Sequence, residues 1–160
     1  MSSNPKSTFQ IAGHPIHPMI IPFPVAFFVS AFVTDLLFLA GYGNGLATGS
    51  MWLLGAGLVM AALAAVAGLI DFFGEPRIRA LRESWMHMIG NVIVVVLELV
   101  NFFLRYGEQP ATVPSLGVLI SGVAAVLLIF NGWMGWQMVY QHRVGIADAQ
   151  EQRGGPLPRE

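Results

Sequence analysis

Four histidines are the residues of this chain best suited to chemistry: His14, His17, His87 and His142. Imidazole is the commonest protein ligand for metals, and it titrates near neutral pH. The sequence contains no cysteine, which excludes disulfides, iron–sulfur clusters held by this chain and thioether-attached haem. It also lacks a nucleophile-elbow serine motif and a phosphate-binding glycine loop. The candidate chemistry is therefore metal binding, haem binding or proton transfer by histidine.

The elements that carry these histidines are predicted to be membrane-spanning helices. Apolar residues make up 55% of the 160 residues and charged residues only 11%, a composition that a soluble domain of this length could not keep in water. Crossing the roughly 30 Å hydrocarbon layer takes about 20 helical residues. Four apolar stretches reach that length: 20–40, 51–70, 85–104 and 116–139.

We therefore predict an all-α integral membrane protein, in which residues 13–144 form an up-down four-helix bundle. The connection between spans two and three should contain a short turn of helix entered at Pro76. Residues 1–12 and 145–160 are predicted to be flexible tails. No internal repeat is apparent.

An even number of spans places both termini on one side of the membrane, here called the terminal face, together with the loop between spans two and three. Seven basic residues belong to this face: Lys6, Arg77, Arg79, Arg82, Arg143, Arg153 and Arg159. The opposite side has only Arg105. The positive-inside rule makes the terminal face cytoplasmic, and the resulting prediction is a multi-pass protein of the cell membrane with both termini inside.

All four histidines belong to the terminal face, and so does Asp71 at the end of the second span. We predict a cofactor site there, with the histidines as ligands and Asp71 orienting one imidazole through its other ring nitrogen. His87 should be the best-fixed ligand because it lies on the regular helix of a span. In the entry sequence GHPIHP, Pro15 and Pro18 are expected to exclude a regular helix and to stiffen the chain around the other two histidines.

The third span also carries a polar stripe. His87, Asn91, Glu98, Asn101 and Arg105 fall within about 40° of one line at 100° per residue. Such a stripe should face the bundle interior or a subunit contact rather than lipid. Asp35 in the first span and Asn131 in the fourth are the other intramembrane polar candidates. Two interpretations stay open: a chain of exchangeable groups, or a structural network in which Arg105 balances an acid.

Helix spacing bears on the choice between haem b and a bare Zn, Cu or Fe ion. Packed neighbours lie about 8–10 Å apart, whereas the two ligand backbones of a bis-imidazole haem need a wider separation. Spans one and three are diagonal in an up-down bundle, so haem favours His87 with His14 or His17. Spans three and four are neighbours, so His87 with His142 suits a small ion. Both cofactors stay open.

Several motifs occur in order along most of the chain: GHPIHPMIIPFP (13–24), TDLLFLAG (34–41), AGLIDFF (67–73), His87 after a basic loop, and GWMGWQMVYQHRVGI (132–146). In these motifs the sequence resembles a bacterial membrane family labelled domain of unknown function 2231. It departs from the family at Arg143, where glycine is usual. The resemblance implies no assigned activity. Relatives joined to Rieske or cytochrome domains imply electron transfer by analogy only.

Three functions are consistent with these features. The first is a haem or metal site that serves electron transfer or metal handling, and the second is a non-catalytic subunit that anchors or stabilises a larger membrane redox complex. The third, a small carrier or channel, has the least support because no span is broken. The near-zero net charge suggests no nucleic-acid partner. The small residues of spans two and four could pack the bundle or form a homo-oligomer.

Overall fold

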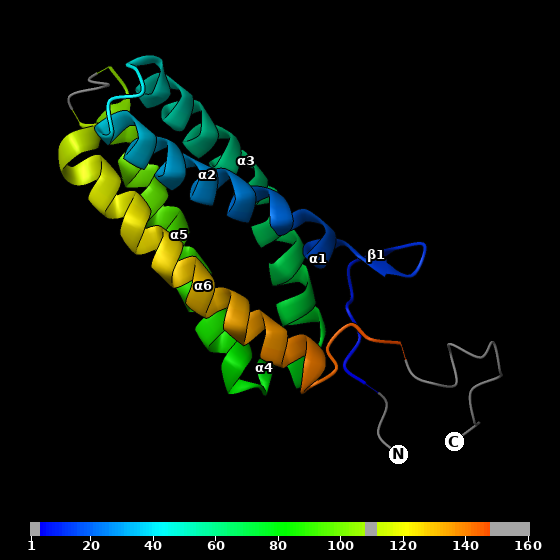
Figure 1. The fold of residues 1–160 in the computed structure, drawn as a ribbon. Coiled ribbons are helices and arrows are strands. Elements are labelled where there is room, and N and C mark those ends of the chain that lie inside the picture. Colours follow the sequence, from blue (N-terminus) through cyan, green and yellow to red (C-terminus); the bar gives the residue numbers. More distant parts are fainter. Residues whose placement is uncertain (1–3, 108–111, 148–160) are drawn as a thin grey trace, which may run out of the picture.

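Four long helices form the body of the protein (Figure 1). The structure is a computed structural model that describes residues 4–107 and 112–147. The first span consists of a short helix, α1 (Ile16–Ile20), which leads into α2 (Pro22–Leu39). The other long helices are α3 (Gly45–Gly74), α5 (Arg82–Arg105) and α6 (Val118–Tyr140). All four spans are long and apolar enough to cross a membrane, which confirms the predicted fold class.

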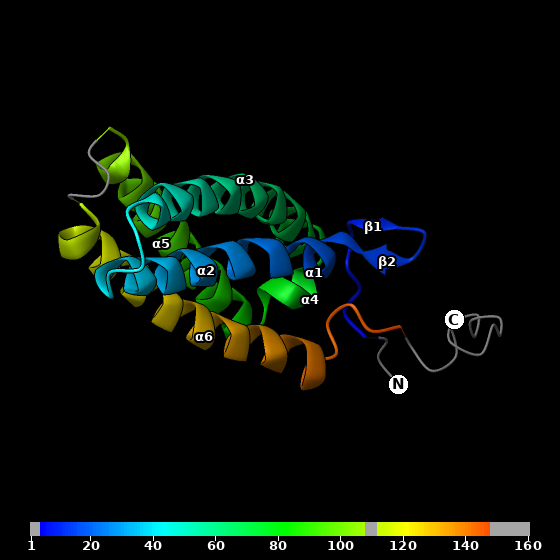
Figure 2. The same ribbon diagram turned by 45° about the horizontal axis from the view of Figure 1, so that its top comes forward.

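The helices alternate in direction, and each packs against two neighbours (Figure 2). α2 contacts α3 and α6, and α5 contacts the same two helices. Consequently α2 and α5 lie on one diagonal of the bundle, and α3 and α6 lie on the other. This is the up-down order expected from short connections. The start of the first span and the start of α5 therefore reach the terminal face from opposite corners.

Some helix boundaries differ from the sequence prediction. α3 begins at Gly45, so part of the expected loop 41–50 is helical. The predicted turn of helix is present as α4 (Pro76–Arg79), and the Glu75 carboxylate caps it by accepting the Arg77 N–H at 3.1 Å. A wide turn, η1 (Val113–Gly117), precedes α6. In η1 the Gly117 N–H donates to the Thr112 carbonyl at 3.0 Å.

The expectation that Pro15 and Pro18 exclude a helix is wrong. Pro18 lies in the first turn of α1, where the N–H that proline lacks would have no partner inside the helix. His17 is therefore carried by helical backbone. His14 instead belongs to β2 (His14–Pro15), which pairs antiparallel with β1 (Gln10–Ile11).

The amino-terminal segment is hydrogen-bonded to the bundle. The Asp71 carboxylate accepts the Ser7 hydroxyl at 2.8 Å and the backbone N–H groups of Thr8 and Phe9 at 2.7 and 2.8 Å. The Gly145 N–H donates to the Pro5 carbonyl at 2.8 Å. Residues 4–12, which the sequence assigns to a flexible tail, are thus part of the fold. Residues 1–3, the centre of the loop 106–114 and most of the predicted tail, 148–160, lie outside the described residues.

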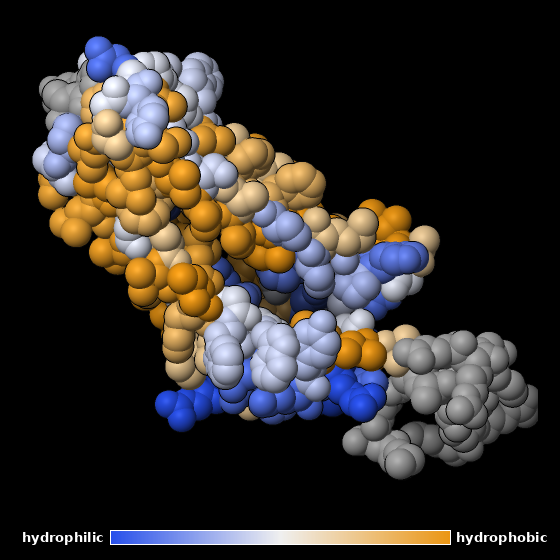
Figure 3. All heavy atoms as spheres, in the orientation of Figure 1, coloured by the Kyte–Doolittle hydropathy of each residue, from blue (hydrophilic) through white to orange (hydrophobic). Residues whose placement is uncertain are grey.

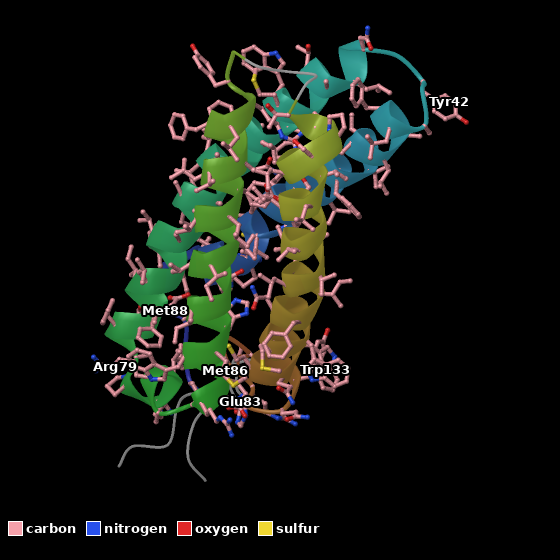
Figure 4. All side chains as sticks on the ribbon, turned by 90° about the vertical axis from the view of Figure 1, so that its left-hand side faces the viewer. Tyr42, Arg79, Glu83, Met86, Met88 and Trp133 are labelled. Atoms are coloured by element: carbon pink, nitrogen blue, oxygen red, sulfur yellow. The ribbon has the colours of Figure 1, made fainter. Side chains whose placement is uncertain are left out.

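Apolar side chains cover the outer faces of the helices, and polar residues gather toward the ends (Figure 3). Figure 4 places Arg79 and Glu83 at the terminal face and Tyr42 at the opposite end. Inside the bundle, an apolar layer separates the two ends: Phe28, Ala31, Leu54, Ala61, Val94 and Ala124. Gly57 permits the close contact with Phe28, because a Cβ there would lie 2.5 Å from the ring. This distribution is the one expected of a bundle surrounded by lipid.

Candidate functional site

Two histidines lie close together inside the terminal end of the bundle. His17 comes from α1 and His87 from the beginning of α5. Their ring centroids lie 6.4 Å apart, and their ring planes are inclined by 84°. Both side chains are partly buried. Because their helices occupy one diagonal, the two rings meet across the axis of the bundle.

Each ring is held through the same nitrogen by a neighbouring helix. His17 Nδ1 lies 2.8 Å from the carbonyl oxygen of Ala64, and His87 Nδ1 lies 3.0 Å from that of Asn131. A carbonyl can only accept, so each Nδ1 carries a proton and each neutral ring keeps its lone pair on Nε2. Neither Nε2 has a hydrogen-bond partner among the described residues. Both rings therefore offer a nitrogen that could bind a metal.

A glycine four residues after each of these carbonyls lets the ring approach. Gly68 follows Ala64, and a Cβ at Gly68 would lie 2.9 Å from His17 Nδ1. Gly135 follows Asn131, and a Cβ there would lie 3.4 Å from His87 Cε1. The first distance is too short for a Cβ contact, whereas the second is close to ordinary packing. Both glycines are visible in the sequence, but only the fold shows which imidazole each one accommodates.

A cavity of about 540 Å³ adjoins the two rings. Apart from His17 and His87 its walls are mainly apolar, and small residues line it from α3 and α6: Ala61, Ala64, Ala65, Gly68, Gly132 and Gly135. α2 and α6 diverge toward the terminal face (Figure 1), and Figure 3 shows a hollow in the same region. The volume lies within the range of about 300–1,000 Å³ that small-molecule and cofactor sites occupy.

The other residues predicted for the cofactor site lie elsewhere at the terminal face. His14 is exposed, and its Nδ1 lies 3.0 Å from the Ala12 carbonyl oxygen in its own loop. His142 Nε2 lies 3.5 Å from a carboxylate oxygen of Glu83. Asp71 binds the amino-terminal segment, so the groups that orient the rings of His17 and His87 are backbone carbonyls. Within residues 4–107 and 112–147, no three histidine, aspartate or glutamate side chains form a group that could hold a metal ion.

Two asparagines connect α5 with α6 beside the cavity. Asn91 Nδ2 donates to the His87 carbonyl at 2.9 Å, and Asn131 Nδ2 donates to Asn91 Oδ1 at 3.3 Å. Gly90 permits this contact, because a Cβ at that position would meet the Asn131 amide. The terminal half of the polar stripe thus supports the histidine pair.

A second polar site occupies the opposite half of the bundle. Arg105 Nη1 and Nη2 contact the two carboxylate oxygens of Asp35 at 2.6 and 2.7 Å. Arg105 also donates to Ser50 Oγ at 2.6 Å, to Ser121 Oγ at 3.0 Å and to Asn101 Oδ1 at 2.9 Å. All five N–H bonds of the guanidinium are therefore used. Asn101 in turn donates to Glu98 Oε2 at 2.9 Å, and all six side chains are buried.

The sequence indicated the charged members of this site but not its serines. Ser50 falls between the expected spans 20–40 and 51–70, and Ser121 is one of the small residues of span four, which indicate only close helix packing. Ser50 joins the site because α3 begins earlier than predicted, and Ser121 joins it because its face of α6 packs toward α2. A serine inside an apolar span is too common a feature to identify such a site by itself.

The two helix hairpins, α1–α3 and α5–α6, place equivalent groups at equivalent positions. In each hairpin a histidine of the first span binds a carbonyl of the second span. In each, a charged residue 18 positions after that histidine contacts a serine of the second span: Asp35 with Ser50, and Arg105 with Ser121. Equivalent residues meet across the bundle axis, as in an approximate two-fold relation. The histidines and the serines match in residue type, whereas Asp35 and Arg105 have opposite charges.

Comparison with known families identifies the chain. A family model described as "Predicted membrane protein (DUF2231)" matches residues 13–148. The chain belongs to the DUF2231 family. The match includes the histidine pair and the second polar site. No curated protein and no solved structure matches the chain. Arg143 has a φ of 54°, a left-handed conformation that glycine adopts without strain.

Proposed function

We propose that this DUF2231 protein is a membrane electron-transfer protein in which His17 and His87 would hold one haem b through their Nε2 atoms. The observation that carries the proposal is the close pair of imidazoles beside an apolar cavity, each held through Nδ1 and each with an Nε2 that has no hydrogen-bond partner among the described residues. A bound haem would supply a one-electron iron couple. The protein's own groups would hold the two ligand rings, select their tautomers and limit the access of water.

The separation of the rings fits one shared iron. Bonds between a metal and an imidazole nitrogen are about 2.0–2.1 Å long, so two rings on opposite sides of one ion have centroids about 6 Å apart. The centroids of His17 and His87 are 6.4 Å apart.

The rest of the site favours haem over a bare ion. Two imidazoles leave most positions of a Zn, Cu or Fe ion unfilled, and His14 and His142 lie apart from the pair. A porphyrin brings four nitrogens of its own. The small residues that line the cavity from α3 and α6 lie on the diagonal that the histidines do not use, and they leave room for the edges of a macrocycle.

The proposal places the haem near the cytoplasmic face of the cell membrane, where it would exchange electrons with a soluble or membrane-bound redox partner. Its support is the charge bias of the sequence, since the only basic residue of the opposite half, Arg105, is buried in an ion pair. Reporter fusions after Gly45 should be external, and fusions at Glu160 should be internal. The reverse pattern would move the site to the outer face.

Absorption spectroscopy of the purified protein tests the haem. Expression with a haem precursor should give one haem per chain and, on reduction, the spectrum of a low-spin iron with two nitrogen axial ligands. His17→Ala and His87→Ala should each remove that spectrum. His14→Ala and His142→Ala are matched controls from the same face and should retain it.

Three results would contradict the proposal. Equal loss in all four histidine variants would remove the assignment of the ligand pair. Zinc or copper bound in a His17- and His87-dependent way would replace haem by an ion. A wild-type protein that remains colourless and free of metal after haem-replete expression would favour the non-catalytic subunit of a larger complex.

A further inference from the structure

Glu98 is a buried carboxyl group that the proposed haem site does not use. It lies on α5, and its side chain has no exposed surface. Oε2 accepts the Asn101 amide at 2.9 Å. Oε1 is buried and has no hydrogen-bond partner among the described residues. A carboxyl oxygen left in this state inside a membrane bundle needs either a proton or a small polar ligand.

The charges around Glu98 leave it without a counter-ion. Asp35 of α2 and Arg105 of α5 pair with each other, while α3 and α6 contribute the uncharged Ser50 and Ser121. The five N–H bonds of Arg105 are all engaged with groups other than Glu98. With both acids ionised, the site would hold two negative charges and one positive charge. A carboxylate with one hydrogen bond is costly there, and protonation removes the excess charge.

Glu98 does not line the cavity but lies about one helical turn beyond its wall. The cavity wall includes Val94 and Val95, which precede Glu98 on α5 by about one turn, or roughly 5 Å along the helix axis. In the other direction Asn101 and Arg105 stand between Glu98 and the far end of α5. The cavity is thus the nearest hollow on the terminal side of Glu98, and the apolar side chain of Val94 lies between the two.

We infer that Glu98 is a proton-binding site, which holds a proton in the resting protein and exchanges it with water. On release, the Oε1–H bond breaks, the proton passes to a water molecule, and the electron pair stays on the carboxylate. Uptake is the reverse. The inference depends on the contacts of Glu98 and holds without haem. One extension rests on the proposed function: reduction of an iron in the cavity would favour proton uptake, because the added electron favours the neutral acid.

Infrared spectroscopy can detect this proton directly. A neutral carboxyl has a C=O stretching band above the amide region, and an ester-free detergent such as dodecyl maltoside leaves that region clear. Glu75 should not contribute near neutral pH, because the Arg77 guanidinium lowers the pKa of its carboxyl to about 2. We expect one neutral-carboxyl band at pH 7, its loss in Glu98→Gln, and its retention in the surface control Glu83→Gln. In D₂O the band should shift while the protein remains folded.

The same measurement on His87→Ala separates this inference from the haem proposal, since the band should persist without a cofactor. If Glu98→Gln does not fold, glutamate labelled with ¹³C at the carboxyl still assigns the band, because only a glutamate band shifts. No neutral-carboxyl band, or a band that survives Glu98→Gln, would overturn the inference. A band that never shifts in D₂O without unfolding would identify a structural proton and would equally overturn it.

Discussion

Replacing Arg105 by methionine should destabilise the bundle by about 3–5 kcal/mol, the usual cost of removing one partner of a buried ion pair. The structure places the effect in this range for two reasons. Arg105 and Asp35 have no exposed surface, so water cannot take over the lost contacts. After the change, Asp35 keeps only the hydroxyl groups of Ser50 and Ser121 as hydrogen-bond donors.

A double-mutant cycle isolates the pair from the rest of the site. Asp35→Asn should cost a similar amount, because it leaves the guanidinium charge without its partner. The combination of Asp35→Asn with Arg105→Met leaves no charge unpaired between these two positions. Its cost should fall below the sum of the single changes by about 2–3 kcal/mol, near the upper end of measured couplings.

Equilibrium unfolding of the detergent-solubilised protein with increasing sodium dodecyl sulfate provides the measurement, followed by the loss of helical circular dichroism. The chain contains a matched control in the exposed Arg77–Glu75 pair, whose N–O distance is 2.9 Å. Arg77→Met should cost less than about 1 kcal/mol. If Arg105→Met costs no more than this control, or if the double variant shows no coupling, the buried pair does not stabilise the fold as inferred.

Three further predictions concern the terminal face. Gly68→Ala should displace His17, because the new Cβ would lie 2.9 Å from its Nδ1, whereas a Cβ at Gly135 would lie 3.4 Å from the His87 ring. In haem titrations Gly68→Ala should weaken haem binding about tenfold more than Gly135→Ala. Equal effects of the two substitutions would contradict the inferred packing of the rings. Asp71→Ala should speed hydrogen exchange in residues 4–12 without affecting the long helices, since Thr8 and Phe9 lose their acceptor. The pKa of Glu75 is about 2 in the folded protein, against an ordinary value of 4.5. The ionised Glu75 carboxylate therefore stabilises the fold fully above pH about 4.5, and this stabilisation is lost as the pH falls toward 2. Glu75→Gln should remove this part of the acid dependence of unfolding.

The spans and their order could be predicted because apolar length is a local property of the sequence and short connections make successive helices neighbours. The same holds for the interior facing of Glu98, Asn101 and Arg105, which follows from helical spacing alone. The composition of the histidine site could not be predicted in this way. His17 is oriented by a carbonyl 47 residues away, and a backbone carbonyl has no signature in residue type. Likewise, nothing local shows that the carboxylate oxygens of Asp71 accept hydrogen bonds from the amino-terminal segment.

The two-fold relation between the hairpins limits how such a bundle can be assembled. A helix hairpin whose two ends lie on the same side of the membrane can be duplicated in tandem without inverting the second copy. In such a duplication the histidine of one copy can lie opposite the equivalent histidine of the other. The ion pair cannot arise in that way, because identical hairpins would set two carboxylates or two guanidinium groups against each other. Asp35 and Arg105 therefore require two hairpins of different sequence. Because both hairpins belong to one polypeptide, they are present in a ratio of one to one. If the hairpins were separate chains, each bundle would have to assemble from two unlike hairpins rather than two identical ones.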